Sequence, residues 1–256
     1  MKKALVVLAV ACAAGSAVAK PGDVIKFGTS PAYAPFEYKT ATGIAGFDVD
    51  LGNEICRRLQ AKCVWVENDF DGLIPALKAR KFDAILASMS ITETRKKQIA
   101  FSDKLYNSPT RMVARKGSKL QPTAAALKGL RVGVQQGTVQ ETYAKKRWEA
   151  AGVNVVAYQN QEQVYQDLTS GRIQASLQDA VEAEYGLLKS SKGANFEFAG
   201  TTLKDADIFG IGAGIGLRQE DETLRKDINR ALAEMLKDGS YHKIAGKYFS
   251  FDIYNN

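Results

Sequence analysis

Apolar residues in the first hundred positions alternate between short continuous runs and helical spacing. Continuous runs such as Phe82–Ala87 are typical of strands buried on both faces, whereas Leu51, Ile55 and Leu59 recur on one face of a helix. The predicted order is a strand Val24–Thr29, a turn region with Pro31, Pro35 and Gly43, a helix Leu51–Ala61, a strand Val64–Glu67, a helix Leu73–Arg80 capped by Asp71, a strand Phe82–Ala87 and a polar helix opened by Thr92. This alternation indicates a parallel sheet with flanking helices.

The same alternation restarts near residue 130. The predicted elements are a strand Arg131–Gln135, a helix ending at Trp148, a strand Val153–Tyr158, a helix Gln161–Ser170, a strand Ile173–Leu177 and a helix Val181–Lys189. Extended runs at Asn107–Ala114 and Ile208–Leu217 flank this second block, and an amphipathic helix Glu220–Lys237 follows. The pattern predicts two α/β lobes joined by two hinge strands, with the last helix returning to the first lobe.

The first nineteen residues have the composition of an export signal. Lys2 and Lys3 precede an apolar stretch Ala4–Ala14, which is too short to span a bilayer, and residues 17–19 (Ala-Val-Ala) form an A-x-A cleavage pattern. The alternative is an N-terminal buried helix of a cytosolic protein. We predict a cleaved signal peptide over residues 1–19, a mature chain from Lys20 and a periplasmic location.

The charge balance argues against a nucleic-acid partner. The full chain carries 35 Lys and Arg and 28 Asp and Glu, at 45% apolar and 25% charged residues, as in an ordinary globular protein. Without the two lysines of the predicted leader the net charge is +5, and the basic residues are interleaved with acidic ones. A mixed solvated surface is the simpler interpretation.

Two cysteines remain after the predicted cleavage, Cys56 and Cys63. In an oxidising compartment an even pair indicates a disulfide. A zinc site is the alternative, but two thiols and the single His242 do not make a ligand set. We therefore expect no metal.

Motifs of nucleotide binding and of hydrolysis are missing from the sequence. The glycines at 210, 212, 214 and 216 do not form G-x-G-x-x-G, because residue 215 is isoleucine, and neither a P-loop nor a G-x-S-x-G motif occurs. The glycines instead predict an extended segment against which another backbone packs closely. No catalytic residue and no cofactor is expected.

Polar side chains follow the predicted strands of both blocks. Ser88, Ser90 and Arg95 come after the strand at 82–87, residues 136–138 (Gln-Gly-Thr) come after the strand at 131–135, and Asp179 follows the strand at 173–177. In open α/β sheets, ligands bind beyond the carboxyl ends of the strands, where helix N-termini favour anions. One cationic and one anionic side chain on different lobes predict a receptor for a zwitterion.

Several segments together resemble one known family. They are YAPFEY, GFDVDLGNEIC, DFDGLIPALKARKFDAI, SMSITETR, IAFSDKLY, GVQQGTVQ, LTSGRI, LQD and KDGSYHKIAGKYF. By these the chain is identified as a member of the periplasmic solute-binding proteins for polar amino acids, near the lysine/arginine/ornithine- and histidine-binding branch. The resemblance implies a two-lobed fold, with lobe 1 at 20–105 and 211–256 and lobe 2 at 106–210.

The resemblance also implies which residues bind the ligand. Arg95, with Ser90 and Thr138, resembles the α-carboxylate site, and Asp179, with Ser88, resembles the α-ammonium site. The remaining implied residues are the aromatic pair Tyr33 and Phe70, the pocket-edge residues Gln135 and Gln140, and Ser30 at the position that reads the ligand side chain. The spacing of Cys56 and Cys63 also matches the family's disulfide.

Two positions depart from the basic-amino-acid branch. Ser30 stands where that branch has an acid, and Ala87 replaces a serine. The prediction that Ser30 sets the specificity assumes that no other acid, such as Glu37 or Asp69, replaces the missing charge. The leading prediction is a cationic ligand, and a neutral polar amino acid or an opine is the alternative.

The expected partners follow from this class of protein. They are a small amino-acid ligand and the inner-membrane permease of an ABC importer, with no nucleic acid, and the chain is expected to be a monomer. A periplasmic dehydratase on the same scaffold is the rival from another class, and it would need a general acid or base beside the ligand. A tethered sensor is a second rival, but no transmembrane stretch is expected after the leader.

Overall fold

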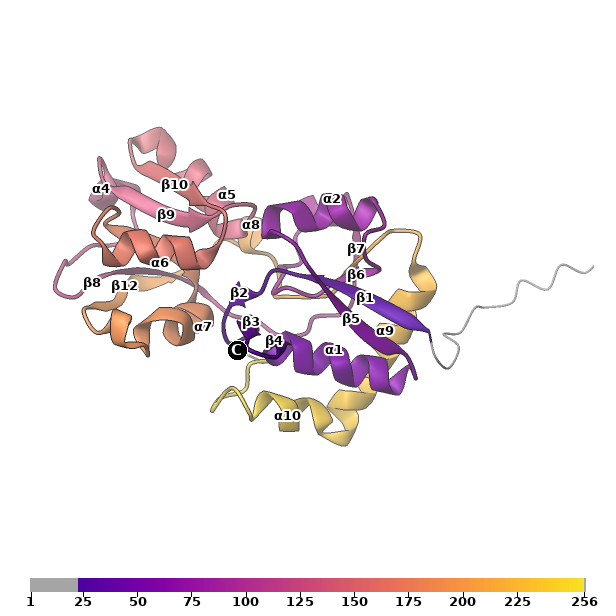
Figure 1. Ribbon diagram of the computed structural model, residues 1–256. Coiled ribbons are helices and arrows are strands. Elements are labelled where there is room, and N and C mark those ends of the chain that lie inside the picture. Colours follow the sequence, from indigo (N-terminus) through magenta and orange to yellow (C-terminus); the bar gives the residue numbers. More distant parts are fainter. Residues whose placement is uncertain (1–22, 256) are drawn as a thin grey trace, which may run out of the picture.

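The computed structural model describes residues 23–255, which form two lobes around separate five-stranded sheets (Figure 1). The predicted signal peptide lies outside the described residues. The first sheet has the order β5-β1-β6-β13-β7, with β1, β5 and β6 parallel and β13 antiparallel to both neighbours. Its strands are β1 (Val24–Thr29), β5 (Lys62–Glu67), β6 (Ala84–Ile85), β7 (Ala100–Phe101) and β13 (Gly216–Leu217).

The second sheet repeats this arrangement with the order β10-β9-β11-β8-β12. Its strands are β8 (Thr110–Arg115), β9 (Arg131–Gln135), β10 (Asn154–Tyr158), β11 (Ala175–Asp179) and β12 (Phe196–Leu203). β9, β10 and β11 are parallel, whereas β8 runs antiparallel to β11 and β12. The prediction of two lobes, each with a mixed sheet flanked by helices, is confirmed.

Helices cover both sheets, and those of the first lobe come from both ends of the described chain. They are α1 (Phe47–Arg58), a 3₁₀ turn (Phe70–Gly72), α2 (Leu73–Lys78), α3 (Glu93–Lys96), α9 (Glu222–Asp238) and α10 (Ser240–Ala245). Ile228 and Leu232 of α9 are fully buried in one core with Phe27 and Phe47, so the amphipathic stripe of this helix does pack on the first lobe. Figure 1 shows α9 and α10 beside α1.

The second lobe carries shorter helices. They are α4 (Ala124–Leu127), α5 (Val139–Arg147), a 3₁₀ turn (Glu149–Ala151), α6 (Gln161–Thr169), α7 (Ala180–Ala183), a π-helical turn (Glu184–Leu188) that continues it, a 3₁₀ turn (Ser191–Gly193) and α8 (Ala206–Phe209). Trp148, at the end of α5, is buried in a core with Leu127 and Val132. Each lobe therefore has its own hydrophobic core.

The two chain segments that join the lobes, the first connection at Tyr106 and the second at Ala213, pair with each other. Ala213 forms β-bridges with Ser90 and Tyr106, and its backbone is bonded to Leu105 and Tyr106. Gly212 has φ +117°, and a Cβ on it would lie 2.4 Å from the carbonyl oxygen of Tyr106. This close approach of two backbones is the role predicted for the alternating glycines, and it brings the two connections together as a hinge.

The structure corrects three local predictions. Asp71 does not cap α2, whose N-cap is Gly72, because the chain first makes a 3₁₀ turn. The extended run predicted from Ile208 begins inside α8, which Asp205 caps by accepting a hydrogen bond from the Ile208 amide. The turn region before α1 contains a small sheet of β2 (Ala32–Tyr33), β3 (Glu37–Thr40) and β4 (Gly43–Ala45).

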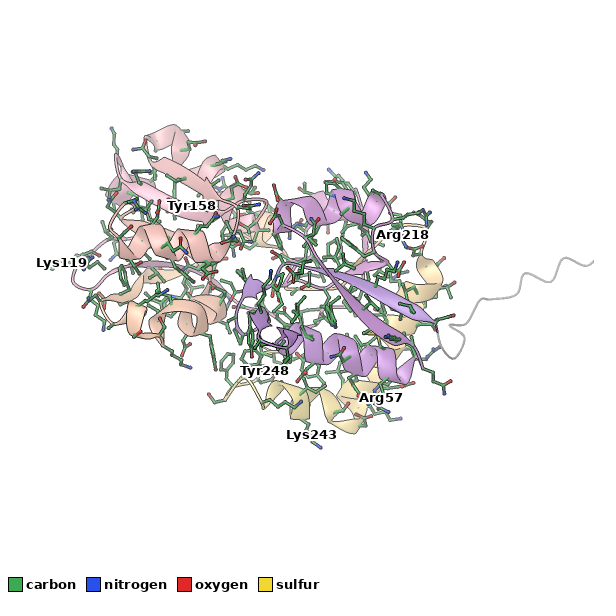
Figure 2. All side chains as sticks on the ribbon, in the orientation of Figure 1. Arg57, Lys119, Tyr158, Arg218, Lys243 and Tyr248 are labelled. Carbon is green, nitrogen blue, oxygen red and sulfur yellow. A yellow bond between two sulfur atoms is a disulfide. The ribbon has the colours of Figure 1, made fainter. Side chains whose placement is uncertain are left out.

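Charged side chains are spread over the molecular surface. Figure 2 places Arg57 and Lys243 on one edge of the first lobe and Lys119 at the far end of the second, and all three are exposed. Exposed ion pairs such as that of Arg57 with Glu54 contribute little to stability. The distribution agrees with the mixed solvated surface that the sequence indicates.

Candidate functional site

The candidate site is a cavity of about 320 Å³ whose walls come from both lobes and from the two connections between them. Its volume lies at the lower end of small-molecule pockets. All the side chains predicted to bind the ligand line this cavity, and they are Ser30, Tyr33, Phe70, Ser88, Ser90, Arg95, Gln135, Thr138, Gln140 and Asp179. The fold thus brings the predicted set to one place, while the contact of each residue with a ligand stays a prediction.

Arg95 is a buried cation without a counter-ion among the described residues. It lies in α3, which Thr92 caps as predicted, and its side chain is 8% exposed. Nη1 donates to the Ser90 carbonyl at 2.9 Å, and Nη2 donates to the Gly137 carbonyl at 3.0 Å. Burial lowers the pKa of Arg95 to about 10, and the guanidinium lies 5.5 Å from the centre of the Phe70 ring. Its remaining N–H donors suit an anion such as a carboxylate.

Asp179 presents one free carboxylate oxygen on the second lobe. It ends β11 and caps α7, and Oδ1 accepts hydrogen bonds from the Val181 amide at 2.9 Å, from the Glu182 amide at 3.0 Å and from the Ser108 hydroxyl. Burial raises the pKa of Asp179 to about 6, although these three donors act in the opposite direction. Oδ2 has no hydrogen-bond partner within residues 23–255, so it can accept from an ammonium group.

The N-terminus of α5 faces the cavity next to Arg95. Thr138 caps this nine-residue helix by accepting from the Glu141 amide at 3.1 Å, and its hydroxyl donates to the Gln135 carbonyl at 2.7 Å. The helix dipole and the free amides of its first turn favour negative charge here. An anion held by Arg95 therefore meets the positive end of α5 from the other lobe.

The lobes also touch directly at the edge of the cavity. Gln136 donates to the Asp71 carboxylate at 2.9 Å, and Gln159 donates to the Asp69 carboxylate at 2.6 Å. Gly137 has φ +78°, and a Cβ on it would lie only 2.8 Å from the Cα of Asp71. The structure therefore has the two lobes in contact across the cleft.

Asp48 fixes the position of Ser88 from behind the cavity wall. Ser88 has φ +50°, an uncommon conformation for a serine, and its amide donates to Asp48 Oδ2 at 2.8 Å. The Tyr106 hydroxyl donates to Asp48 Oδ1 at 2.7 Å and lies 2.9 Å from the Ser88 hydroxyl. Asp48 is fully buried, and burial raises its pKa to about 6. Neither the sequence pattern nor the resemblance assigned this supporting role to Asp48.

Glu37 is a cavity carboxyl that the sequence prediction did not assign to the site. It is 1% exposed, pairs with Tyr33 across β2 and β3, and lies 3.4 Å from the Ser88 hydroxyl. Burial, and then the neighbouring Asp48 carboxyl, raise the pKa of Glu37 well above its usual range. Asp69, the other acid considered as a replacement for the missing charge at Ser30, does not line the cavity.

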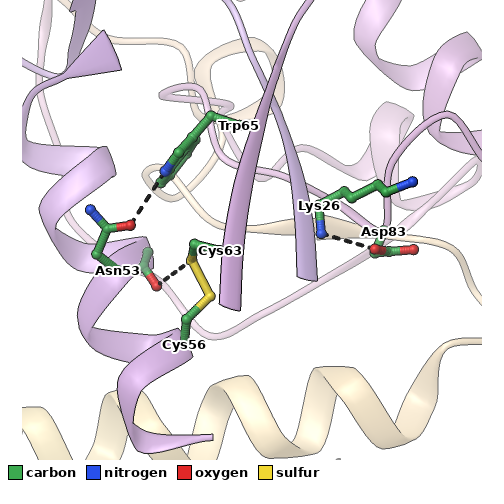
Figure 3. The surroundings of a disulfide bond; sticks show 7 residues. Lys26, Asn53, Cys56, Cys63, Trp65 and Asp83 are labelled. Carbon is green, nitrogen blue, oxygen red and sulfur yellow. Dashed lines mark hydrogen bonds between the residues drawn. A yellow bond between two sulfur atoms is a disulfide. The ribbon is translucent and has the colours of Figure 1, made fainter. Parts of the chain in front are cut away.

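The predicted disulfide is confirmed. Cys56 of α1 and Cys63 of β5 are bonded, with their Cα atoms 5.8 Å apart (Figure 3). The bond links the helix to the following strand, and neither cysteine lines the cavity. Its role is structural, away from the candidate site.

Two further observations concern the described residues only. No group of three or more His, Cys, Asp or Glu side chains within 23–255 is arranged to hold a metal ion, and His242 is exposed on α10. No helix in the same range is both long and apolar enough to cross a membrane.

Two α/β lobes with a small charged cavity between them define the class of two-lobed solute-binding proteins. The chain belongs to the bacterial extracellular solute-binding proteins, family 3, whose family model matches residues 25–251. The resemblance of the sequence segments is thereby confirmed.

Similar proteins of this family bind amino acids. The lysine/arginine/ornithine-binding periplasmic protein of Escherichia coli K12 is 51% identical over 261 residues, covering 100% of both chains. The histidine-binding periplasmic protein of Salmonella typhimurium is 50% identical over 258 residues, covering 99% of each chain. Among solved structures, an ancestral arginine-binding protein bound to arginine has a TM-score of 0.83 at 37% identity, covering 90% of this chain and 100% of the other. These similar proteins are binding proteins, not enzymes.

Proposed function

We propose that this chain is the ligand-binding component of an ABC importer and that it captures a polar L-amino acid in the cavity between its lobes. One observation supports this most strongly. The buried Arg95 guanidinium and the half-buried Asp179 carboxylate line one cavity, and neither forms an ion pair with an opposite charge in the described part of the chain. A zwitterion supplies a carboxylate to the first and an ammonium to the second.

Each end of the ligand then has a defined set of partners. The α-carboxylate binds the Arg95 fork, with Ser90 and the capped end of α5 at Thr138 as further donors. The α-ammonium binds Asp179, with the Ser88 hydroxyl nearby. Because Arg95 belongs to the first lobe and Asp179 to the second, the ligand favours the closed arrangement of the lobes over an open one.

The side-chain end of the cavity favours a cationic amino acid. Tyr33 and Phe70 offer aromatic faces, and Glu37 supplies the carboxyl that Ser30 lacks. The similar proteins that bind lysine, arginine, ornithine or histidine support the same choice. A neutral polar amino acid is the second candidate, because Ser30 and Ala87 also line the cavity and carry no charge.

The similar proteins that are named periplasmic support a proposal for the setting of this function. We place the mature chain in the periplasm after removal of residues 1–19, as a monomer that delivers its ligand to an inner-membrane permease. We also keep the lobe limits given above, 20–105 with 211–256 and 106–210, because the strands of each sheet fall within them. Catalysis is not part of the proposal, since Asp179 is already occupied as a helix cap and ammonium partner.

A thermal-shift screen of the twenty amino acids, ornithine and citrulline tests the proposal. A ligand at 100 times its dissociation constant adds about 2.7 kcal/mol to the unfolding free energy, or roughly 5–10 °C for a chain of this size. We expect the largest shift with arginine, lysine, ornithine or histidine. If none of the compounds raises the melting temperature, the proposed function is wrong.

A further inference from the structure

Glu37 and Asp48 form a buried carboxyl pair in and behind the cavity wall. Glu37 is 1% exposed and Asp48 is fully buried. Asp48 accepts hydrogen bonds from the Ser88 amide and the Tyr106 hydroxyl, whereas Glu37 has only the Ser88 hydroxyl at 3.4 Å as a donor. No ion pair within residues 23–255 includes either carboxyl. Two negative charges in such a place are costly, because neither solvent nor a cation offsets them.

Around Glu37 the carboxyls of Asp48 and Asp179 add negative charge, the tyrosine hydroxyls are neutral, and no Lys or Arg within residues 23–255 forms an ion pair with Glu37. Tyr33 faces it from β2, Asp48 from α1, Tyr106 from the first connection and Asp179 from the end of β11. The donors on Asp48 favour its ionised form, and burial together with Asp48 favours the protonated form of Glu37. Burial and the closeness of the two carboxyls therefore favour one proton held by the pair, and the donors on Asp48 favour its position on Glu37, the carboxyl that lines the cavity.

We propose that Glu37 adjusts the charge of the cavity to the ligand: it keeps its proton against a neutral side chain and releases it to solvent when a cationic side chain binds, a role that rests on the proposed function above. One O–H bond of the Glu37 carboxyl breaks, the proton goes to buffer, and the carboxylate that remains pairs with the ligand cation. One cavity then accepts both a cation and its neutral isostere, with a different number of protons exchanged for each.

Proton release gives the affinity a defined pH dependence. While Glu37 is protonated in the free protein, a cationic ligand must displace a proton, so its affinity rises with pH by up to about tenfold per unit. The affinity for a cationic ligand stops rising once the pH is high enough for Glu37 to be ionised in the ligand-free protein. A neutral side chain displaces no proton, and its affinity lacks this component.

Arginine and citrulline are the matched probes, because they share a shape and a backbone but differ in side-chain charge. Calorimetric titration at pH 7.5 in phosphate and in Tris gives the protons exchanged from the dependence of the binding enthalpy on buffer. Protons exchanged at the common α-amino group cancel in the comparison. We expect arginine to release about one proton more than citrulline.

Two variants assign the proton to a residue. Glu37→Gln retains the shape of the protonated acid, so we expect it to abolish the difference between the ligands and to lower the arginine-to-citrulline affinity ratio at least about tenfold. The control variant is Glu184→Gln, at a partly exposed side chain paired with Lys189 at 3.0 Å. It should leave unchanged both the difference in proton release and the arginine-to-citrulline affinity ratio. Equal proton release by the two ligands in the wild type, or a difference that persists in Glu37→Gln, would overturn this role of Glu37 alone.

The comparison of arginine with citrulline in the wild-type protein tests the proposal even if the Glu37→Gln variant does not fold. If no amino acid binds at all, the proposed function fails and the proton release fails with it. If arginine binds and citrulline binds with the same proton release, the proposed function stands and the charge adjustment does not.

Discussion

Replacing Arg95 by alanine should separate ligand binding from stability. The ligand carboxylate loses two charge-assisted hydrogen bonds of about 1.5–3 kcal/mol each, so we expect a loss of about 3–6 kcal/mol, or roughly 150- to 20,000-fold in affinity. The ligand-free protein should melt at the same temperature or higher, because the variant removes a buried charge for which burial alone shifts the pKa. Arg95→Lys keeps the charge without the planar fork and should lose affinity to an intermediate degree.

Calorimetry with the ligand found in the thermal-shift screen measures this loss, and circular dichroism melts measure stability. Arg80→Ala is the matched control, because Arg80 is exposed and pairs with Glu220 at 2.9 Å, outside the cavity. An affinity for Arg95→Ala within threefold of the wild type would refute the assignment of Arg95 to the carboxylate. A large fall in melting temperature would instead mean that its bond to the Gly137 carbonyl of the second lobe holds the lobes together without ligand.

Three further predictions concern closure, specificity and the disulfide. Gly137→Ala places a methyl group against Asp71 across the cleft and should weaken ligand binding at least about tenfold by calorimetry. The control Gly117→Ala, at a similar positive φ but with no atom within 4 Å of the added Cβ, should bind like the wild type. If both variants bind with the same affinity, the contact of Gly137 with Asp71 does not limit closure. Ser30→Asp should tighten binding of a basic amino acid by about tenfold without helping a neutral one, and an unchanged arginine-to-glutamine affinity ratio would mean that residue 30 does not read the side chain. Replacing Cys56 and Cys63 together by serine should lower the unfolding free energy by about 2 kcal/mol, seen as a fall of roughly 4–8 °C in melting temperature, and an unchanged melting temperature would contradict a stabilising role.

Several helices and strands could be predicted because the spacing of their apolar residues matches the side chains that the structure buries. β1 and β9 have the bounds expected from sequence, and Thr92 caps α3 as predicted. β12 was missed because Phe196–Leu203 has no continuous apolar run and contains Gly200, where the strand register shifts. Its pairing with β8 depends on residues far away in sequence, which periodicity does not report.

The site could be predicted where a residue follows a strand or matches a family position. Arg95 and Asp179 satisfy both conditions, and both line the cavity. Glu37 does not follow a predicted strand, because it lies in a short strand that the sequence pattern presents as a turn, and the resemblance of the segment YAPFEY assigned no role to it. Its burial arises from the pairing of β2 with β3 and from the packing of Asp48 behind it, which are both tertiary effects.

The place of β13 in the first sheet has a consequence for the order in which the chain folds during synthesis. All strands of the second sheet lie between Thr110 and Leu203, so every strand of that sheet is synthesised before Gly216. The first sheet cannot form completely until β13 has been synthesised, because β13 fills the position between β6 and β7. A nascent chain released before Leu217 leaves β6 and β7 with open edges, and unpaired strand edges are where one unfinished chain joins another.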